Sequence, residues 1–508
     1  MRKLIKLLFS RVFHIGLFVL FELALFIAIL LGTYKNAPII YSSFWVINVL
    51  VVIRMFSKDE QSYEYKLLWL LIIMMIPPVG AILYVVFGKK STDRKALSKL
   101  KKIYTKTENL CVQDKEVLDK LYSYKKHLGK NASYLNNVAK APVYDNCKVE
   151  YLKNGQTKFE KMIEELKKAE KFICMEYFII EPGKMLDTIL EILYEKAEKG
   201  VEVYFMYDDF GCVTRVPFNY DKMLMEKGIK VVKFNRLKPK LYSFMNYRDH
   251  RKITVIDGKV GFVGGINIAD EYINEVDVFG YWKDTAVMIE GNAVWNLTVM
   301  FFQLWNFMSK EEVNIEKYKV SHSVESNGFV QPFGDDPFDD LNVAESNYIN
   351  IINSAHEYIY ITTPYLVIDT VMLNALAMAS LGGVDVRIIV PGIPDKKSVF
   401  WVTQSYYKSL LKAGVKIYEY TPGFIHAKMF VSDDDTAVIG TINLDYRSLY
   451  LHFECGSVFY NGEIVTTVRD DILDSLDKCK QITLDEIEKT SIIKRTIQAI
   501  LRVIAPLM

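Results

Sequence analysis

The sequence predicts an α/β protein made of two duplicated lobes, with a transmembrane helical region before them at the amino terminus. Three observations support this prediction: one motif that occurs twice, an alternation of strand-like and helix-like segments that also occurs twice, and apolar runs near the start of the 508-residue chain. An α/β domain gives such an alternation because its helices cover the faces of a largely parallel sheet.

The repeated motif consists of His, one residue, Lys, four residues and Asp, and it is followed after six more residues by a Gly and then an Asn. A single short motif is a weak signal, but a second copy with identical spacing indicates an internal duplication. The two copies are His250, Lys252, Asp257, Gly264 and Asn267, and His426, Lys428, Asp433, Gly440 and Asn443.

The elements expected around each motif follow the same order in the two halves. Glycines at the helix ends, the usual C-cap residues, mark equivalent points of the two halves. We therefore expect lobes at residues 141–311 and 341–480, packed about a pseudo-two-fold axis, with residues 312–340 as the linker. The expected order is strand 171–180, helix 185–199, strands 201–207 and 229–234 in the first lobe, and strand 358–365, helix 371–381, strands 384–390 and 415–420 in the second.

Residues 1–90 hold three apolar runs, at 12–31, 37–53 and 67–87. A bilayer crossing needs about 20 apolar residues. We expect two spans and a broken third segment, because Pro77 and Pro78 interrupt the third run; three full spans remain an alternative. Basic residues before the first run and after the third place both of these ends on the cytoplasmic side.

Two flanking segments also suggest membrane contact. Residues 91–140 form a basic and helical linker, and the basic side chains at 89–102 favour an anionic lipid surface; a solvated flank that only sets topology is the alternative. Residues 481–508 form an amphipathic helix, either interfacial or packed on the catalytic region. The net charge of +2 and scattered cysteines argue against nucleic-acid binding, a disulfide scaffold and a zinc site.

The residue types of the motif suit phosphodiester transfer without a metal. His and Lys are two apart at the start of a strand, so both point to one face. A neutral imidazole attacks phosphorus, the opposite imidazolium protonates the leaving alkoxide, and the two rings titrate as a coupled pair. The Lys and Asn donors stabilise the charge that builds on the phosphate oxygens.

Four carboxylates accompany the motif. Asp257 and Asp433 are in the opposite strand phase to Lys, so we expect them to point away from the phosphate and hold the fold locally. Glu454, 28 residues after His426, and Asp284, 34 residues after His250, are the candidates for orienting the imidazoles.

The two motifs resemble those of the phospholipase D superfamily, and the surrounding stretches resemble the bacterial cardiolipin synthases. One departure is His452, where the family pattern leads us to expect Asn; it puts only local contacts in doubt. The matching stretches are 247–252, 264–272, 281–285, 363–365, 391–395, 420–428, 445–448 and 453–454.

The resemblance implies reversible phosphatidyl transfer between two phosphatidylglycerol molecules, giving cardiolipin and glycerol through a phosphohistidine. It implies a multi-pass cell-membrane enzyme that needs no metal or other cofactor and takes phosphatidylglycerol and anionic lipid, not nucleic acid, as partners. Hydrolysis, transfer to another alcohol, a membrane-tethered nuclease and a non-catalytic membrane scaffold are the alternatives. By analogy, His250 is the nucleophile and His426 the acid. The residues that match active-site positions are His250, Lys252, Asp257, His426, Lys428 and Asp433, with Asn267 and Asn443 as phosphate-binding amides.

Overall fold

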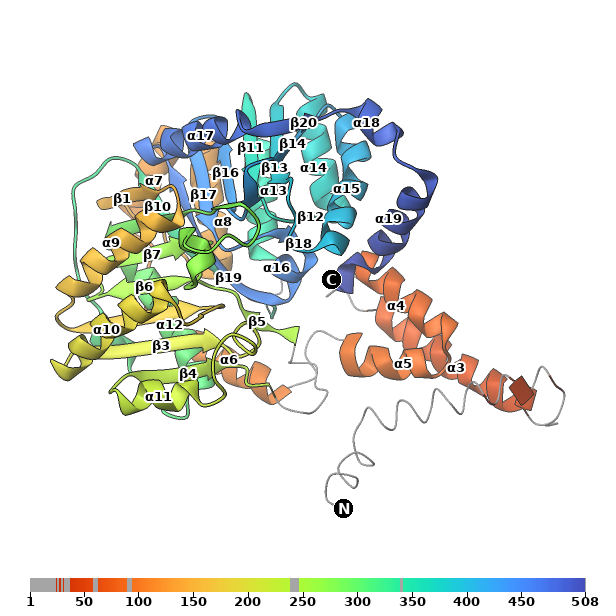
Figure 1. Cartoon of the computed structure of the whole chain (residues 1–508), viewed down its shortest axis with the longest axis horizontal. Helices are drawn as coiled ribbons and strands as arrows, with labels where there is room; N and C mark the ends of the chain where they lie inside the picture. Colours follow the sequence, from red (N-terminus) through yellow and green to blue (C-terminus); the bar gives the residue numbers. More distant parts are fainter. Residues whose placement is uncertain are drawn as a thin grey trace, which may run out of the picture. The chain divides into compact units, whose positions relative to one another are not determined.

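The computed structural model describes residues 24, 27–28, 31, 37–57, 63–88, 94–237, 246–338 and 341–507 (Figure 1). The chain divides into two compact units. One contains residues 1–98, 237–246 and 507, and the other contains residues 99–236, 247–506 and 508.

The described part of the amino-terminal unit contains helices around a small apolar core that includes Trp69 and Tyr84. Its described elements are α3 (Ala37–Phe56), α4 (Tyr63–Met75), α5 (Val79–Leu83) and the π-helix η1 (Tyr84–Gly88). The expected third apolar run is indeed broken, because α4 ends before Pro77 and α5 begins after Pro78. The expected first span, 12–31, lies almost entirely outside the described residues.

Across the residues that the structure describes, no helix combines the length and the apolar character required to cross a bilayer.

In the second unit, each lobe has its own sheet, and the two sheets repeat one plan. The first sheet has the order β1-β9-β7-β6-β2-β3-β4, in which β2, β3 and β4 are parallel. Its strands are β1 (Cys147–Leu152), β2 (Phe172–Tyr177), β3 (Glu202–Asp208), β4 (Lys230–Phe234), β6 (Ile253–Ile256), β7 (Val260–Gly264) and β9 (Ala286–Gly291). Its helices are α9 (Gly155–Lys168), α10 (Lys184–Glu198), α11 (Tyr220–Glu226) and α12 (Val294–Met308).

The second sheet has the order β10-β19-β17-β16-β11-β13-β14-β20, with β11, β13 and β14 parallel. Its strands are β10 (Phe329–Asp335), β11 (Tyr358–Thr362), β13 (Asp385–Pro391), β14 (Lys416–Tyr420), β16 (Met429–Ser432), β17 (Thr436–Gly440), β19 (His452–Tyr460) and β20 (Cys479–Ile482). Its helices are α13 (Val343–Ser354), α14 (Thr370–Leu381), α15 (Lys397–Lys412), α16 (Tyr446–Tyr450) and α17 (Glu463–Leu476). The duplicated α/β fold is thereby confirmed.

The two segments that were expected to be linkers, 91–140 and 312–340, contribute packed helices and a strand to the second lobe. Helices α7 (Lys115–Tyr124) and α8 (Lys126–Ala139) follow α6 (Arg94–Thr107), and their apolar faces join the core of the second lobe through Leu121 and Leu135. Strand β10, inside the expected 312–340 linker, pairs antiparallel with β19. Both segments carry buried apolar residues, and the apolar surface of the second lobe covers them.

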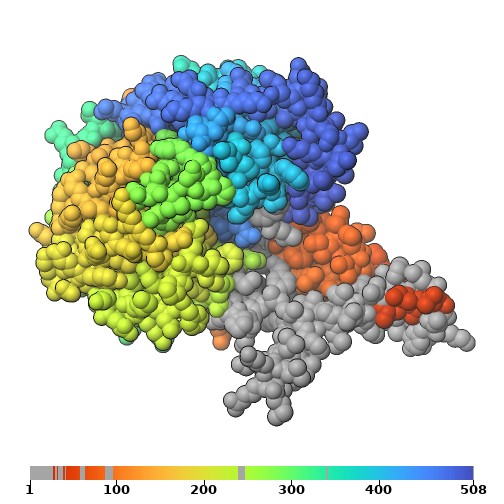
Figure 2. All heavy atoms as spheres, in the orientation of Figure 1, coloured from red at the N-terminus to blue at the C-terminus, as the bar shows by residue number. Residues whose placement is uncertain are grey.

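The two lobes abut directly, as the space-filling view shows (Figure 2). Helix α12 is apolar on nearly all sides, which is typical of a helix surrounded by protein, and it contacts β6 of the first sheet and β10 of the second. Two short parallel pairings also join the lobes: β5 (Arg248–Asp249) with β19, and β8 (Tyr281–Lys283) with β15 (Gly423–Ile425).

Candidate active site

Each motif histidine is positioned by a strand from the opposite lobe. His250 follows β5, and its main-chain N–H donates to the carbonyl of Phe453 at 2.9 Å. His426 follows β15, and its N–H donates to the carbonyl of Lys283 at 2.7 Å. This reciprocity is the contact pattern that a pseudo-two-fold axis between the lobes produces.

The imidazole–carboxylate pairs are also exchanged between the lobes. His250 Nδ1 lies 2.9 Å from both carboxylate oxygens of Glu454, and His426 Nδ1 lies 2.6 Å from Asp284 Oδ2. Along the chain, Glu454 follows His426 and Asp284 follows His250, so the structure pairs them opposite to their sequence order. The cause is the pair of cross-lobe strands, which carries each carboxylate to the far histidine.

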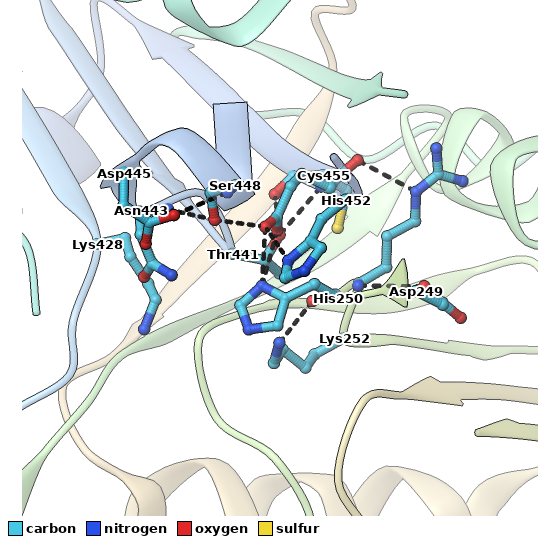
Figure 3. A network of polar contacts seen from close by, with 12 residues as sticks. Asp249, His250, Lys252, Lys428, Thr441, Asn443, Asp445, Ser448, His452 and Cys455 are labelled. Atoms are coloured by element: carbon cyan, nitrogen blue, oxygen red, sulfur yellow. Dashed lines mark hydrogen bonds and ion pairs between the residues drawn. The ribbon is translucent and has the colours of Figure 1, made fainter. Parts of the chain in front are cut away.

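Glu454 is held more firmly than Asp284. Its side chain is fully buried and accepts hydrogen bonds from the hydroxyls of Thr441 and Ser448, the latter at 2.6 Å (Figure 3). Asp284 accepts the N–H of the adjacent Thr285 in addition to the His426 ring. Thr441 and Ser448 were missed from the sequence, although they belong to the Gly-Thr-Ile-Asn and Asp-Tyr-Arg-Ser stretches.

Burial sets the charge state of the two rings. It lowers the pKa of His250 to about 3 against the opposing pull of Glu454. Burial and the charge of Lys428 lower the pKa of His426 to about 4 against that of Asp284. Burial thus favours the neutral form of both rings in the substrate-free site, and the coupled pair of one neutral and one charged ring stays a prediction for the substrate-bound site.

Glu454 stays ionised under the same conditions. Burial raises its pKa, but the interaction with the His250 ring, including the hydrogen bond from Nδ1, outweighs this and holds the pKa well below its usual range. An ionised carboxylate only accepts hydrogen bonds, so His250 donates from Nδ1 and keeps its lone pair on Nε2.

The two lysines are fully enclosed and lie beside the histidines. Each Nζ donates to the main-chain carbonyl two residues earlier, that of His250 for Lys252 and that of His426 for Lys428. Burial lowers the pKa of Lys252 to about 8 and that of Lys428 to about 7, opposed by nearby carboxylates. The charge of Lys252 acts on both His426 and Lys428, so the two motifs meet in one cluster.

The two motif asparagines differ in their contacts. Asn267 has a partner at each amide atom, because Oδ1 accepts from the N–H of Ile179 at 3.0 Å and Nδ2 donates one of its two N–H groups to the Tyr272 hydroxyl at 2.7 Å. The buried Oδ1 of Asn443 has no hydrogen-bond partner among the described residues. Figure 3 shows Asn443 and Lys428 in the cluster with His250.

Asp257 and Asp433 lie outside this cluster and act on the backbone, as their strand phase predicts. Asp257 accepts the main-chain N–H groups of residues 170–172, at 2.7–2.9 Å. Asp433 does the same for residues 356–358, at 2.7–2.9 Å. Both residues have φ near +50°, a conformation that Asp and Asn adopt more readily than most residues.

His452, the departure from the family pattern, lies directly beside His250. It is 8% exposed, and its ring centroid is 5.4 Å from that of His250. The equivalent position of the first lobe holds Trp282, whose ring centroid is 5.5 Å from that of His426. Among the described residues, His250, His452 and Glu454 are the group able to hold a metal ion.

Comparisons with known proteins agree with this arrangement. The family model described as "Cardiolipin synthase, PLD-like domain" matches residues 162–303 and 348–475, and the phospholipase D-nuclease N-terminal model matches residues 44–89. The cardiolipin synthase of Alkalihalophilus pseudofirmus is 34% identical over 91% of this chain and 95% of its own length. That of Clostridium perfringens is 35% identical over 87% of this chain and 93% of its own length.

Among solved structures, the phosphatidylserine synthase of Haemophilus influenzae shares the fold, with a TM-score of 0.56 at 16% sequence identity. The match covers 74% of this chain and 97% of that one. The duplicated family match, together with relatives above 30% identity along most of their length, establishes the assignment. The chain belongs to the cardiolipin synthase family of phospholipase D-like enzymes.

Proposed function

We propose that this chain, as a phosphatidyltransferase of the cardiolipin synthase type, moves a phosphatidyl group from one phosphatidylglycerol molecule to another and releases glycerol. The observation that carries the proposal is the crossed pair of imidazole–carboxylate contacts, His250 with Glu454 and His426 with Asp284. Two oriented imidazoles, one from each lobe, are what a two-step displacement at one phosphorus needs.

In the first step, His250 Nε2 attacks phosphorus, the bond from phosphorus to the glycerol oxygen breaks, and His426 gives its proton to that oxygen. In the second step, His426 takes the proton of a glycerol hydroxyl on the second lipid, and that oxygen displaces His250 from phosphorus. The phosphohistidine preserves the energy of the phosphodiester, so the reaction is reversible.

The enclosed site favours substrate-dependent charging of the acid. Burial lowers the pKa of His426 in the substrate-free site. The negative charge of a bound phosphodiester raises this pKa, so that the ring takes up a proton when the substrate binds. Lys252 and Lys428 then face an anion inside a low-dielectric site, where each ammonium stabilises charge more strongly than it does in water.

The proposal includes residence at the cell membrane, as a multi-pass protein with the catalytic unit on the cytoplasmic side. Exposed apolar side chains support lipid contact: on α3, Leu50 and Ile53 are 62% and 61% exposed. On α19 (Ile492–Ile504), Ile492 and Ile493 are 76% and 74% exposed while the opposite side packs on α15. A site held at the bilayer meets both lipids at high effective concentration.

We also propose the division that the sequence indicates, into a membrane region (1–90), a helical segment (91–140), two lobes (141–311 and 341–480) joined by 312–340, and a terminal region (481–508). In this division α7, α8 and β10 pack as parts of the second lobe, and the terminal region holds two helices, α18 (Leu484–Glu488) and α19, rather than one. The two separate stretches of the family match support the division into lobes.

The test is the lipid product of purified full-length protein in phosphatidylglycerol vesicles. We expect cardiolipin and glycerol in equal amounts, and no formation of either in His250→Ala or His426→Ala. His127→Ala, a change at a half-buried histidine that contacts Asp435, is the matched control and should keep the rate. Phosphatidic acid as the main product would mean hydrolysis, and transfer in either motif variant would refute the two-imidazole mechanism.

A further inference from the structure

The second lobe places a third imidazole within the cluster, and the steps proposed above do not use it. His452 is the first residue of β19, two residues before Glu454, so the two side chains point to one face of the strand. The imidazole of His452 lies beside the His250 ring (Figure 3), with the ring centroids 5.4 Å apart.

The geometry of the three side chains is that of an incomplete ligand set. His452 Nδ1 is buried, has no hydrogen-bond partner within the described part of the chain, and lies 3.7 Å from Glu454 Oε1. His250 Nδ1 lies 2.9 Å from the same oxygen. The donor atoms of the three residues all lie within 4.8 Å of one another.

The donor set selects the kind of ion. Two imidazole nitrogens and one carboxylate oxygen suit Zn²⁺ and related transition ions rather than Mg²⁺ or Ca²⁺, which prefer oxygen ligands. Zinc–ligand bonds of about 2.0–2.2 Å require the three donor atoms to move closer together when the ion binds. Ser448 already donates to Glu454 and fixes its carboxylate in place.

We propose that His250, His452 and Glu454 bind a divalent transition-metal ion, with Zn²⁺ as the best match, and that this ion inhibits the transferase. Binding itself does not depend on the proposed function, whereas the inhibition rests on it. The metal binds His250 through Nδ1, whereas Nε2 of the same ring attacks phosphorus in the proposed reaction.

Inhibition follows from the proton count of one imidazole. In the active state, His250 carries its proton on Nδ1 and its lone pair on Nε2. When the metal bonds to Nδ1, that proton passes through solvent to Nε2, and the neutral ring has no lone pair left for phosphorus. No electron is transferred, and removal of the ion restores the first tautomer.

The pseudo-symmetry of the two lobes limits the site to one half. Trp282 takes the place of His452 beside His426, and an indole offers no lone pair to a metal. The pair of His426 and Asp284 therefore lacks a third ligand at this position, and one ion per chain is expected.

The test measures metal binding and transfer separately on purified full-length protein in detergent. Zn²⁺ is titrated by calorimetry, and Co²⁺ is used as a spectroscopic probe of nitrogen and oxygen ligands. We expect one site in the wild type and an affinity loss of more than about tenfold in His452→Asn, which also raises the Zn²⁺ concentration for half-inhibition by a similar factor. Each variant is compared with its own metal-free rate.

His322→Asn is the matched control. It makes the same substitution at a half-buried histidine whose Nε2 is 3.1 Å from Glu290, and it should leave both metal affinity and inhibition unchanged. Equal affinity in wild type and His452→Asn, or absence of binding to the wild type, would overturn the proposal. X-ray absorption of the wild-type Zn²⁺ complex, which needs no variant, must show two imidazole ligands; fewer would also overturn it.

Failure of the proposed function leaves a different result. If the metal-free wild type produces no cardiolipin, but Zn²⁺ binding still depends on His452, the metal site stands and the transferase assignment fails.

Discussion

The exchange of carboxylates between the lobes predicts that Glu454→Gln nearly abolishes activity while the chain still folds. Glutamine has the size of glutamate, but it turns one acceptor oxygen into a donor. Glu454 accepts from the His250 ring, Thr441 and Ser448, so the new amide meets donors. His250 is then stabilised in the other tautomer, with Nδ1 accepting from the amide and the proton on Nε2.

The size of the effect follows from this loss of the attacking lone pair. A wrong-tautomer substitution of a histidine-orienting carboxylate costs up to about 10⁴-fold in rate, so we expect a decrease of about 10²- to 10⁴-fold. At about 1.4 kcal/mol per factor of ten, this corresponds to a barrier increase of about 3–5.5 kcal/mol. The mismatched buried hydrogen bonds add a stability cost of about 1–3 kcal/mol.

The assay follows cardiolipin formation from phosphatidylglycerol vesicles, with thermal unfolding measured in parallel. Glu345→Gln is the matched control, a second buried glutamate of the same lobe. Burial and the charge of Asp369 raise the pKa of Glu345 to about 7, so a neutral amide resembles its protonated form. We expect the control to keep its rate within about twofold. A Glu454→Gln enzyme with more than a tenth of wild-type activity would refute the orientation argument.

Three further predictions concern the rest of the site and the membrane contact. Asp257→Asn should lower the free energy of unfolding by about 1–3 kcal/mol in denaturant titrations, because it weakens three main-chain hydrogen bonds. The folded variant should stay active, and a full loss of activity at normal stability would give this Asp a catalytic role. Burial lowers the pKa of His250 to about 3 and that of His426 to about 4, so the unfolded chain binds more protons than the folded chain below pH 6.5. The free energy of unfolding should therefore fall from pH 6.5 to 4, by up to about 1.4 kcal/mol per pH unit for each ring. An equal dependence on pH in the His250→Ala, His426→Ala double variant would contradict this. Ile493→Asp, at a site 74% exposed on α19, should lower the yield of lipid photocrosslinks to α19 in full-length protein reconstituted in anionic vesicles, without changing the unfolding temperature. An unchanged yield would exclude α19 as a membrane contact.

The duplicated fold could be predicted because its signal is local and occurs twice. His250 and His426 each precede a strand, and the glycines that end equivalent helices lie at equivalent points of the two halves. The backbone role of Asp257 and Asp433 was also accessible, because strand phase alone separates them from the lysines.

The partners of the histidines could not be assigned by chain order. Asp284 and Glu454 were identified as orienting carboxylates, but spacing along the chain does not say which lobe supplies each contact. The cross-lobe pairing of β5 with β19 and of β8 with β15 decides this, and each pairing joins only two or three residues per strand. Such short pairings leave no periodicity in the sequence.

The flanking segments show a second limit of sequence reasoning. A polar segment with scattered apolar residues resembles a linker, and only the packed lobe reveals that Leu121 of α7 and Val330 of β10 are buried. The protonation of the site lysines was the hardest property to predict from the sequence. The pKa values of Lys252 and Lys428 depend on burial by residues from both lobes.

Trapping the covalent intermediate tests directly whether the His250 ring attacks phosphorus. Wild-type protein is mixed with phosphatidylglycerol and quenched within one turnover, under conditions that preserve the bond between phosphorus and the ring nitrogen. The protein is then digested, and the modified residue is identified by mass spectrometry. A phosphatidyl group on the His250 ring is the expected result, absent from His250→Ala and also from His426→Ala, which lacks the acid that protonates the leaving glycerol oxygen. Cardiolipin formed with no adduct on either motif histidine would exclude a phosphohistidine intermediate.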